Sequence, residues 1–279
     1  MTSIPQRRVF QAGSTTYFHS SLFFAPAMRD EVFALYGFVR TADNFVDAVP
    51  QQAEAFARFA ARYRAARDGT PAGDPLIDDF VALQRKRGFD PDWTEAFLGS
   101  MAADLTRRFY RTEAETLDYV YGSAEVIGLF MARIMQLPEE ALPAARMLGR
   151  AMQFINFIRD AAEDAAMGRR YLPLERDGTS LLDESADWLP TREWGRANPG
   201  KWTAFLQGHL ARYEAWQAEA EAGYPFIPRR PRTAVRTAGD MYNWTARQIE
   251  ADPFVVFERK VKPRKARIML RALWNGLRG

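Results

Sequence analysis

Two pairs of aspartates are the residues of this sequence best placed to do chemistry. Asp43 and Asp47 end the largely apolar run EVFALYGFVRTADNFVD, and Asp160 and Asp164 occur within QFINFIRDAAEDAAMGRRYLP. Successive residues of an α-helix are separated by about 100°, so residues four apart project from nearly the same side. Each pair therefore predicts two neighbouring carboxylates on one face of a helix.

Further polar residues precede each pair on the same face. Tyr36 and Arg40 lie about two turns and one turn before Asp43, and Gln153 and Asn156 stand in similar places before Asp160. Phenylalanine and isoleucine or alanine occupy the opposite sides. The two segments therefore share a design in which one face packs and the other carries polar groups.

A single D-x-x-x-D pair is most simply a solvated helix surface, and two pairs could also form a structural network of ion pairs. The arginines available for such a network are Arg40, Arg159, Arg169 and Arg170. Buried carboxylates are costly unless cations offset them. Mg²⁺ is commonly held by one or two carboxylates, water and the phosphate oxygens of a substrate. Two facing acidic stripes with basic residues between them would therefore suit a bound diphosphate.

The composition argues against several other kinds of site. The 279 residues contain no cysteine and only two histidines, His19 and His209, so thiol chemistry and histidine-rich metal sites are not expected. A formal net charge of +3 is a small excess, and we expect no nucleic-acid partner. Any metal would then be held by oxygen ligands, which favours Mg²⁺, Mn²⁺ or Ca²⁺.

Helical periodicity dominates the chain and predicts an all-α fold. Hydrophobic residues make up 47% of the sequence and no linker or repeat divides it, so we expect one domain over residues 1–279. Breaks rich in proline or glycine separate the expected helices. These helices span residues 27–48, 51–67, 74–87, 91–110, 113–136, 139–166, 197–222, 230–251 and 253–277.

Segment 168–191 is a long stretch without helical periodicity. Such a connection inside a compact domain is usually functional, and we expect a flap that excludes water, with a plain surface loop as the alternative. The chain shows no apolar core of a signal peptide and no run of about 18 apolar residues. We therefore expect a cytoplasmic protein without a transmembrane helix.

The order and spacing of the motifs resemble the squalene/phytoene synthases, which join prenyl diphosphates head to head. ALYGFVRTADNFVD and QFINFIRDAAEDAAMGRRYLP are similar to the two aspartate motifs of that family. DYVYGSAEVIGLFMARIM is similar to its Y-x-Y-x-x-A-x-x-x-G helix, and GSTTYFHSSLFFAP to its N-terminal substrate loop. The resemblance covers nearly the whole chain and implies a single-domain helical bundle of the class I isoprenoid synthase type with a central cavity.

The resemblance also implies roles for individual residues. The catalytic and metal-binding residues would be Asp43, Asp47, Asp160 and Asp164, with Asn156 as a further metal or phosphate contact and Tyr242 closing over the diphosphate. The substrate-binding residues would be Gly13, Ser14, Thr15, Thr16, Tyr17, Tyr36, Arg40, Tyr121, Gln153, Asn156, Arg159 and Arg259. The implied cofactor is Mg²⁺, with Mn²⁺ as a substitute.

Two departures from the family pattern concern the site. Asn44 replaces an acid that is frequent in the first motif, but it lies about 80° off the acidic stripe, so we expect little effect. Glu125 replaces a glycine on the face of Tyr121 and puts the shape and charge of the substrate channel in doubt. Gly128 and Ala132 would leave room for a prenyl chain, or else allow two helices to pack closely.

The implied reaction is the Mg²⁺-dependent condensation of two geranylgeranyl diphosphates, through a cyclopropyl (prephytoene) diphosphate, to phytoene, the first step of carotenoid biosynthesis. The ending DPFVVFERKVKPRKARIMLRAL and the variant SAEVIGL resemble prokaryotic phytoene synthases. The alternative is a squalene or dehydrosqualene synthase that uses farnesyl diphosphate. We expect a need for NADPH only if squalene is the product.

Other partners and other classes stay open at this point. The basic segment 257–278 could touch the inner face of an anionic membrane, or it could be a helix that caps the core. Downstream carotenoid enzymes are further candidate partners. A non-enzymatic helical assembly factor is the main alternative class, but all four aspartates are retained here. Terpene cyclases and head-to-tail prenyl transferases typically carry D-D-x-x-D or N-x-x-x-S/T-x-x-x-E motifs, and neither is present.

Overall fold

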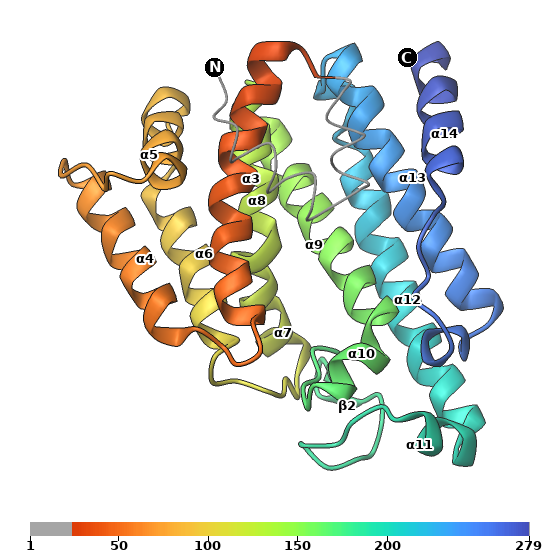
Figure 1. Ribbon diagram of the computed structural model, residues 1–279. Helices are drawn as coiled ribbons and strands as arrows, with labels where there is room; N and C mark the ends of the chain where they lie inside the picture. Colours follow the sequence, from red (N-terminus) through yellow and green to blue (C-terminus); the bar gives the residue numbers. More distant parts are fainter. Residues whose placement is uncertain (1–23, 279) are drawn as a thin grey trace.

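The computed structural model describes residues 24–278, which form a bundle of helices lying side by side (Figure 1). The all-α, single-domain expectation is confirmed. The long helices are α3 (Pro26–Asp47), α4 (Ala53–Arg67), α5 (Pro75–Arg87), α6 (Pro91–Ala103), α9 (Leu142–Arg159), α12 (Pro199–Glu221), α13 (Arg229–Ala251) and α14 (Lys265–Arg278). The short elements are α7 (Glu113–Val120), α8 (Val126–Ile134), α10 (Ala161–Ala166), α11 (Arg192–Ala197), and the hairpin strands β1 (Glu175–Arg176) and β2 (Thr179–Ser180).

Local signals explain why several helices begin where the sequence predicts. Pro75 stands in the first turn of α5, and Asp74 before it accepts a hydrogen bond from the backbone N–H of Leu76. Thr112 and Glu115 form a reciprocal capping box at the start of α7. Such caps satisfy backbone groups that a helix leaves unpaired at its end. The predicted starts of these two helices are therefore correct to within one residue.

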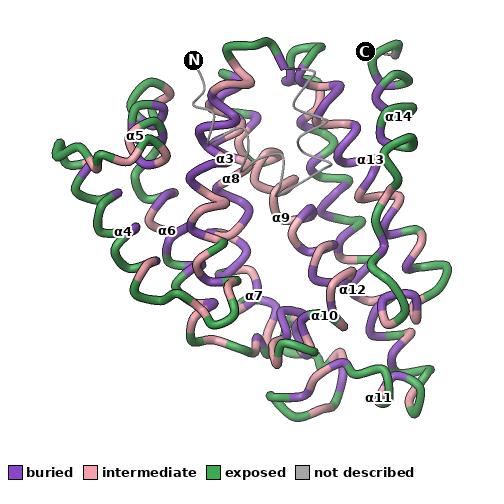
Figure 2. The backbone as a smooth tube through the Cα atoms, viewed as in Figure 1, coloured by how far each residue is buried: buried purple, intermediate pink, exposed green. Residues whose placement is uncertain are grey.

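Two hydrophobic clusters hold the bundle together. The first joins α3, α4, α5, α6 and α8 around Phe38, whose ring stacks on that of Phe80 with centroids 3.9 Å apart. The second joins α7, α9, α12 and α13 around the fully buried Trp202 and Tyr213. Figure 2 shows buried residues along the inner sides of these helices. The clusters fix α3 and α9, which carry the polar faces predicted from the sequence.

The turn between α7 and α8 departs from α-helical geometry. Tyr121–Glu125 form a π-helix, η1, which packs closely against α6. A Cβ atom on Gly122 would lie 2.1 Å from the carbonyl oxygen of Ala96, so only glycine permits this approach. A π-helix has more residues per turn than an α-helix, so it rotates the residues before it relative to the residues after it. Tyr121 and Gly128, which the sequence places beside the substrate on a regular helix, therefore do not share one face.

Three predicted helices differ from those in the structure. The predicted helix 91–110 ends at Ala103, and the predicted helix 139–166 is divided at Asp160. The predicted helix 253–277 holds only a short 3-10 turn before α14 begins at Lys265, because prolines interrupt this stretch. Among the helices within residues 24–278, none combines the length and apolar character needed to cross a bilayer.

Candidate active site

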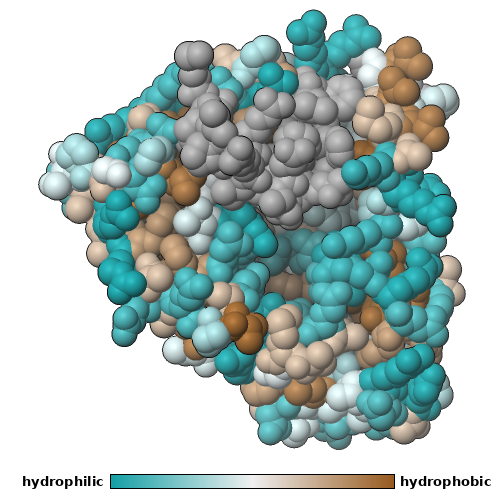
Figure 3. Space-filling view, in the orientation of Figure 1, coloured by the Kyte–Doolittle hydropathy of each residue, from teal (hydrophilic) through white to brown (hydrophobic). Residues whose placement is uncertain are grey.

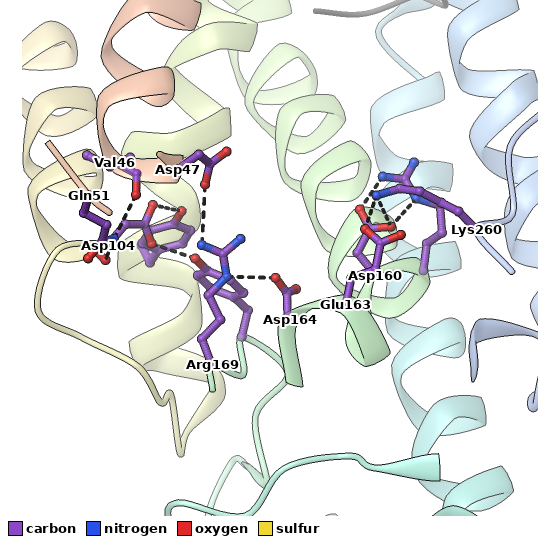
Figure 4. A network of polar contacts seen from close by, with 12 residues as sticks. Val46, Asp47, Gln51, Asp104, Asp160, Glu163, Asp164, Arg169 and Lys260 are labelled. Carbon is purple, nitrogen blue, oxygen red and sulfur yellow. Dashed lines mark hydrogen bonds and ion pairs between the residues drawn. The ribbon is translucent and has the colours of Figure 1, made fainter. Parts of the chain in front are cut away.

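The four aspartates lie at the C-terminal ends of α3 and α9 and on α10. Asp43 and Asp47 occupy the last two turns of α3. Asp160 separates α9 from α10, and Asp164 lies on α10. Figure 4 shows Asp47 and Asp164 approaching the same guanidinium, that of Arg169, from different elements. The structure thus places the two motifs at one site, although they are far apart in the sequence.

The first pair is only partly neutralised by the protein. Asp43 forms an ion pair with Arg40, one turn earlier on α3. Burial raises the pKa of Asp43 to about 6, and the charge of Asp47 adds to the rise, whereas Arg40 opposes it. An ionised carboxylate here is therefore unfavourable unless more positive charge comes close.

The second pair is held by cations from several segments. Nε of Arg159 donates to Oδ1 of Asp160 at 2.8 Å, and Nζ of Lys260 lies 3.2 Å from the same oxygen. Burial alone would raise the pKa of Asp160, but these two partners bring it below its usual value. Burial raises the pKa of Asp164 to about 6 in spite of its ion pair with Arg169. The two motifs thus differ in how much positive charge surrounds them.

Arg169 connects the two motifs. Its Nε lies 2.9 Å from Oδ1 of Asp164, and its Nη1 lies 3.5 Å from Oδ1 of Asp47. Its guanidinium also lies over the ring of Tyr171, whose hydroxyl donates to Asp104 at 2.7 Å. Asp104 is buried and stands just after α6. Its hydrogen bond holds the ring of Tyr171 in place beneath the guanidinium of Arg169.

Sequence analysis missed Lys260, Asp104 and Tyr171. Lys260 contacts Asp160 from a segment far along the chain, and only the basic run FERKVKP pointed toward it. Asp104 has no second acid at helical spacing, so no pattern distinguished it from a surface residue. Tyr171 lies inside the second motif, but its role depends on contacts that only the fold creates.

An apolar cavity of about 310 Å³ adjoins the acidic ends of α3 and α9. Tyr36, Gln153 and Asn156 contribute to its wall, as expected, and most of the remaining wall is apolar. Oδ1 of Asn156 is buried without a hydrogen-bond partner. α3 and α9 carry the aspartates one or two turns beyond these residues, so the described wall of the cavity ends close to the acidic site.

Other predicted residues are placed differently. Burial lowers the pKa of Arg159, but Asp160 and, to a smaller extent, Tyr242 on α13 bring it above its ordinary value. Arg259 is exposed, while its neighbour Lys260 contacts the site. Tyr121 is not among the described residues that line the cavity, because the π-helix rotates it away; its ring lies 5.2 Å from the guanidinium of Arg146. The predicted loop residues Gly13, Ser14, Thr15, Thr16 and Tyr17 lie outside the described residues.

Glu125 belongs to the protein interior rather than to the described wall of the cavity. Its carboxylate accepts hydrogen bonds from Arg146 at 3.0 Å and from Arg150 at 2.6 Å, both on α9. The concern that it alters the charge of the channel is therefore wrong. A Cβ atom on Gly128 would lie 2.1 Å from the carbonyl oxygen of Ala145, so the glycine allows close helix packing, and it also lines the cavity.

Segment 168–191 contributes none of the described residues of the cavity wall. It holds the β1–β2 hairpin, and its loops are fixed by the buried Arg170. This guanidinium donates to the carbonyl oxygens of Tyr110, Ala186 and Trp188 rather than to the aspartates. The role of the segment as a water-excluding flap stays a prediction.

The donors at the site suit a hard divalent cation that arrives with a phosphate ligand. Within residues 24–278 no three carboxylate or histidine side chains form a ready metal cluster, because the aspartates pair with arginine and lysine. Mg²⁺ needs only one or two carboxylates when water and substrate oxygens complete its coordination. The unpaired Oδ1 of Asn156 is a neutral donor beside them. The residues therefore fit Mg²⁺ bound together with a diphosphate.

Comparison with known proteins agrees with this arrangement. Residues 10–267 match the family model described as squalene/phytoene synthase. The 15-cis-phytoene synthase of Paracoccus sp. is 30% identical over 268 residues, covering 91% of this chain and 84% of the relative. The phytoene synthase of Pseudescherichia vulneris is 28% identical over 260 residues, covering 89% of this chain and 82% of the relative.

Solved structures give the same fold. A dehydrosqualene synthase in complex with a ligand has a TM-score of 0.82 at 18% identity, covering 98% of this chain and 94% of that chain. A squalene synthase from Alicyclobacillus acidocaldarius has a TM-score of 0.77 at 18% identity, covering 89% and 93%. The class is that of the helical isoprenoid synthases, and the chain belongs to the squalene/phytoene synthase family of prenyltransferases. The resemblance seen in the motifs is confirmed.

Proposed function

We propose that this enzyme joins two geranylgeranyl diphosphates head to head, through a cyclopropyl (prephytoene) diphosphate, to give phytoene. The observation that carries the proposal is one apolar cavity adjoining two acidic motifs that Arg169 connects. The choice of a C20 substrate rests on the relatives named phytoene synthase, which match 89% and 91% of the chain.

The acidic end is suited to the departure of a diphosphate. When bound, Mg²⁺ would supply positive charge that stabilises the leaving group. The residues that would hold the ion are Asp43, Asp47, Asn156, Asp160 and Asp164. The guanidinium of Arg169 would donate hydrogen bonds to phosphate oxygens, since charged donors bind phosphate strongly, and the ammonium of Lys260 would offset the charge of Asp160.

The apolar end is suited to the carbon chemistry. Each ionisation breaks a C–O bond, and the diphosphate leaves with the bonding electrons. The double bond of one chain attacks the first allylic cation, and loss of a proton closes the cyclopropane ring. A second ionisation, rearrangement and loss of a second proton give the C40 triene. Tyr242 or the released diphosphate is the proposed proton acceptor, and the apolar wall would keep water from the cations.

Product analysis tests the proposal. The purified protein is incubated with Mg²⁺ and either geranylgeranyl or farnesyl diphosphate, with and without NADPH, and the hydrocarbon is identified. We expect phytoene from the C20 substrate alone, without a need for NADPH. Squalene or dehydrosqualene from the C15 substrate would overturn the choice of substrate. A cyclic terpene, or no release of diphosphate, would overturn the proposed reaction itself.

A further inference from the structure

Helix α14 exposes an apolar face that no described element covers. Most of the large hydrophobic side chains that are exposed in the described part of the protein belong to this one helix: Met269, Leu270, Leu273, Trp274 and Leu277. Leu270 retains 68% and Leu277 82% of their accessible area, values that oppose a role in the core. Figure 3 shows the resulting hydrophobic patch at the upper right, over α14.

The opposite face of α14 anchors the helix to α13. Ile268, Ala272 and Asn275 are buried, and the amide of Asn275 donates to Asp240 at 2.7 Å. Arg271 also pairs with Asp240, at 2.6 Å. At about 100° per residue, the centre of the exposed apolar face lies opposite this buried face. The contacts between α14 and α13 therefore fix the direction in which the apolar face points.

The charged residues of α14 itself are all basic. Residues 259–278 contain eight lysines and arginines and no acidic residue; among them, Lys260 contacts Asp160 and Arg271 pairs with Asp240 of α13. On the helix itself, the exposed Lys265 and Arg267 flank the apolar face on either side. An apolar strip bordered by basic residues is typical of helices that lie in the interface of an anionic bilayer. A protein partner buried against this strip would have to neutralise the same charges.

The loop between α12 and α13 carries a further exposed apolar side chain beside the cavity. The loop between α12 and α13 contributes Tyr224 and Ile227 to the cavity wall and exposes Phe226, followed by the exposed Arg229 and Arg230. This loop leads into the first turns of α13, where a Cβ atom on Gly276 of α14 would lie 3.9 Å from Thr233. The loop and the C-terminal half of α14 therefore belong to one end of the molecule.

We propose that α14, together with the segment 224–230 that leads into α13, lies in the interface of an anionic lipid bilayer. The apolar side chains enter the boundary between headgroups and acyl chains, and the lysines and arginines contact acidic headgroups. A bilayer at this end of the bundle would also accept a hydrocarbon product from the apolar cavity; this last step rests on the proposed function.

Vesicle binding by the full-length protein without substrate tests the surface independently of the reaction. The protein is sedimented with vesicles of phosphatidylcholine alone or of phosphatidylcholine with phosphatidylglycerol. We expect binding to the anionic vesicles that weakens with salt, and a loss of about tenfold or more in the double variant Leu270→Glu/Leu273→Glu. The matched control is Ala57→Glu/Ala61→Glu on the exposed face of α4, which should bind like the parent protein.

Because the chain has no cysteine, a single Leu273→Cys variant can carry an environment-sensitive label at this face, with Ala57→Cys as its control. Anionic vesicles should move the label at residue 273, and not the one at residue 57, into an apolar environment. Equal binding to neutral vesicles, or unchanged binding by the Leu270→Glu/Leu273→Glu variant, would overturn the proposal. The proposal would also be overturned if the parent protein bound no vesicles but formed a dimer, and the Leu270→Glu/Leu273→Glu variant were a monomer.

Discussion

The two aspartate motifs have the same spacing but different surroundings. Asp43 and Asp47 lie on one uninterrupted helix and pair with Arg40 on that helix and with Arg169. Asp160 stands at a break between helices and contacts Arg159 and Lys260. Equal spacing on a helix thus determines which carboxylates are neighbours but leaves their electrostatics to the rest of the fold. Ionisation of Asp43 in the first motif therefore depends more on positive charge brought by a ligand than ionisation of Asp160 does.

The largest effect should come from removing one carboxylate of either motif. Because both motifs serve one leaving diphosphate, Asp47→Asn and Asp164→Asn should each lower the rate of diphosphate release by about 10²–10³-fold. The rate is measured with saturating Mg²⁺ and geranylgeranyl diphosphate. Asp183→Asn, at an exposed position in segment 168–191, is the control and should keep its activity. If only one of the two variants lost activity, the two motifs would not both serve the leaving diphosphate.

Removing the arginine between the motifs should have the next largest effect. Arg169→Met should lower the rate about 10–100-fold, the range typical of residues that orient ligand-binding groups. Arg169→Lys should recover only part of this loss, because a single ammonium cannot reach both Asp47 and Asp164 as the guanidinium does. Full recovery with lysine would mean that only the charge matters and that the bridge does not.

Stability at different pH values sharpens the contrast between Asp43 and Asp160. The pKa of Asp43 is about 6 in the folded protein and 3.8 in its ordinary state, so the folded state gains stability as pH falls from about 7.5 to about 5. The buried His209, with a pKa of about 3, contributes in the opposite direction. Comparing each variant with the parent protein cancels this contribution.

Without Mg²⁺, the stability of Asp43→Asn relative to the parent should therefore decrease by about 1 kcal/mol between about pH 7.5 and about pH 5. The corresponding difference for Asp160→Asn should stay flat. Its lowered pKa gives stability that is present above 3.8 and is lost only as pH falls through the folded value. Denaturant unfolding at both pH values measures these differences, and equal slopes for the two variants would remove the distinction.

The smallest effect should come from Lys260. Asp160 keeps its ion pair with Arg159 when the ammonium is removed, and the lysine side chain is partly exposed. Lys260→Met should therefore reduce the rate of diphosphate release less than about fivefold, as expected for a partly exposed ion pair. Lys201→Met, at an exposed position of α12, is the control. A loss as large as that of Asp164→Asn would place Lys260 among the groups that act directly on the diphosphate.

The parts of the site that the sequence could predict are those set by local periodicity. Asp43 and Asp47 follow from helical spacing alone, and a proline with a capping aspartate marked the start of α5. The break at Asp160 could not be predicted in this way, because FIRDAAEDAA reads as a continuous helix. Its contact with Lys260 comes from a distant segment.

The position of Tyr121 shows a second limit. A helical projection assumes about 100° for every residue, and one π-helical turn changes the face of everything before it. The π-helix coincides with a close approach of Gly122 to Ala96 on α6, a contact between distant segments that a helical projection does not contain. Glu125 was misjudged for a related reason, since its partners Arg146 and Arg150 come from α9. The family resemblance indicated which segments form the site, but contacts between helices determine which side chains face it.

The central claim is that the two motifs act as one site on one diphosphate. A double-mutant cycle on the rate of diphosphate release, with Asp47→Asn, Asp164→Asn and the combined variant, tests it most directly. If the motifs act together, the combined variant should lose little more activity than either single variant, because groups that act as a unit are not additive. Losses that multiply, each variant contributing independently of the other, would contradict the account.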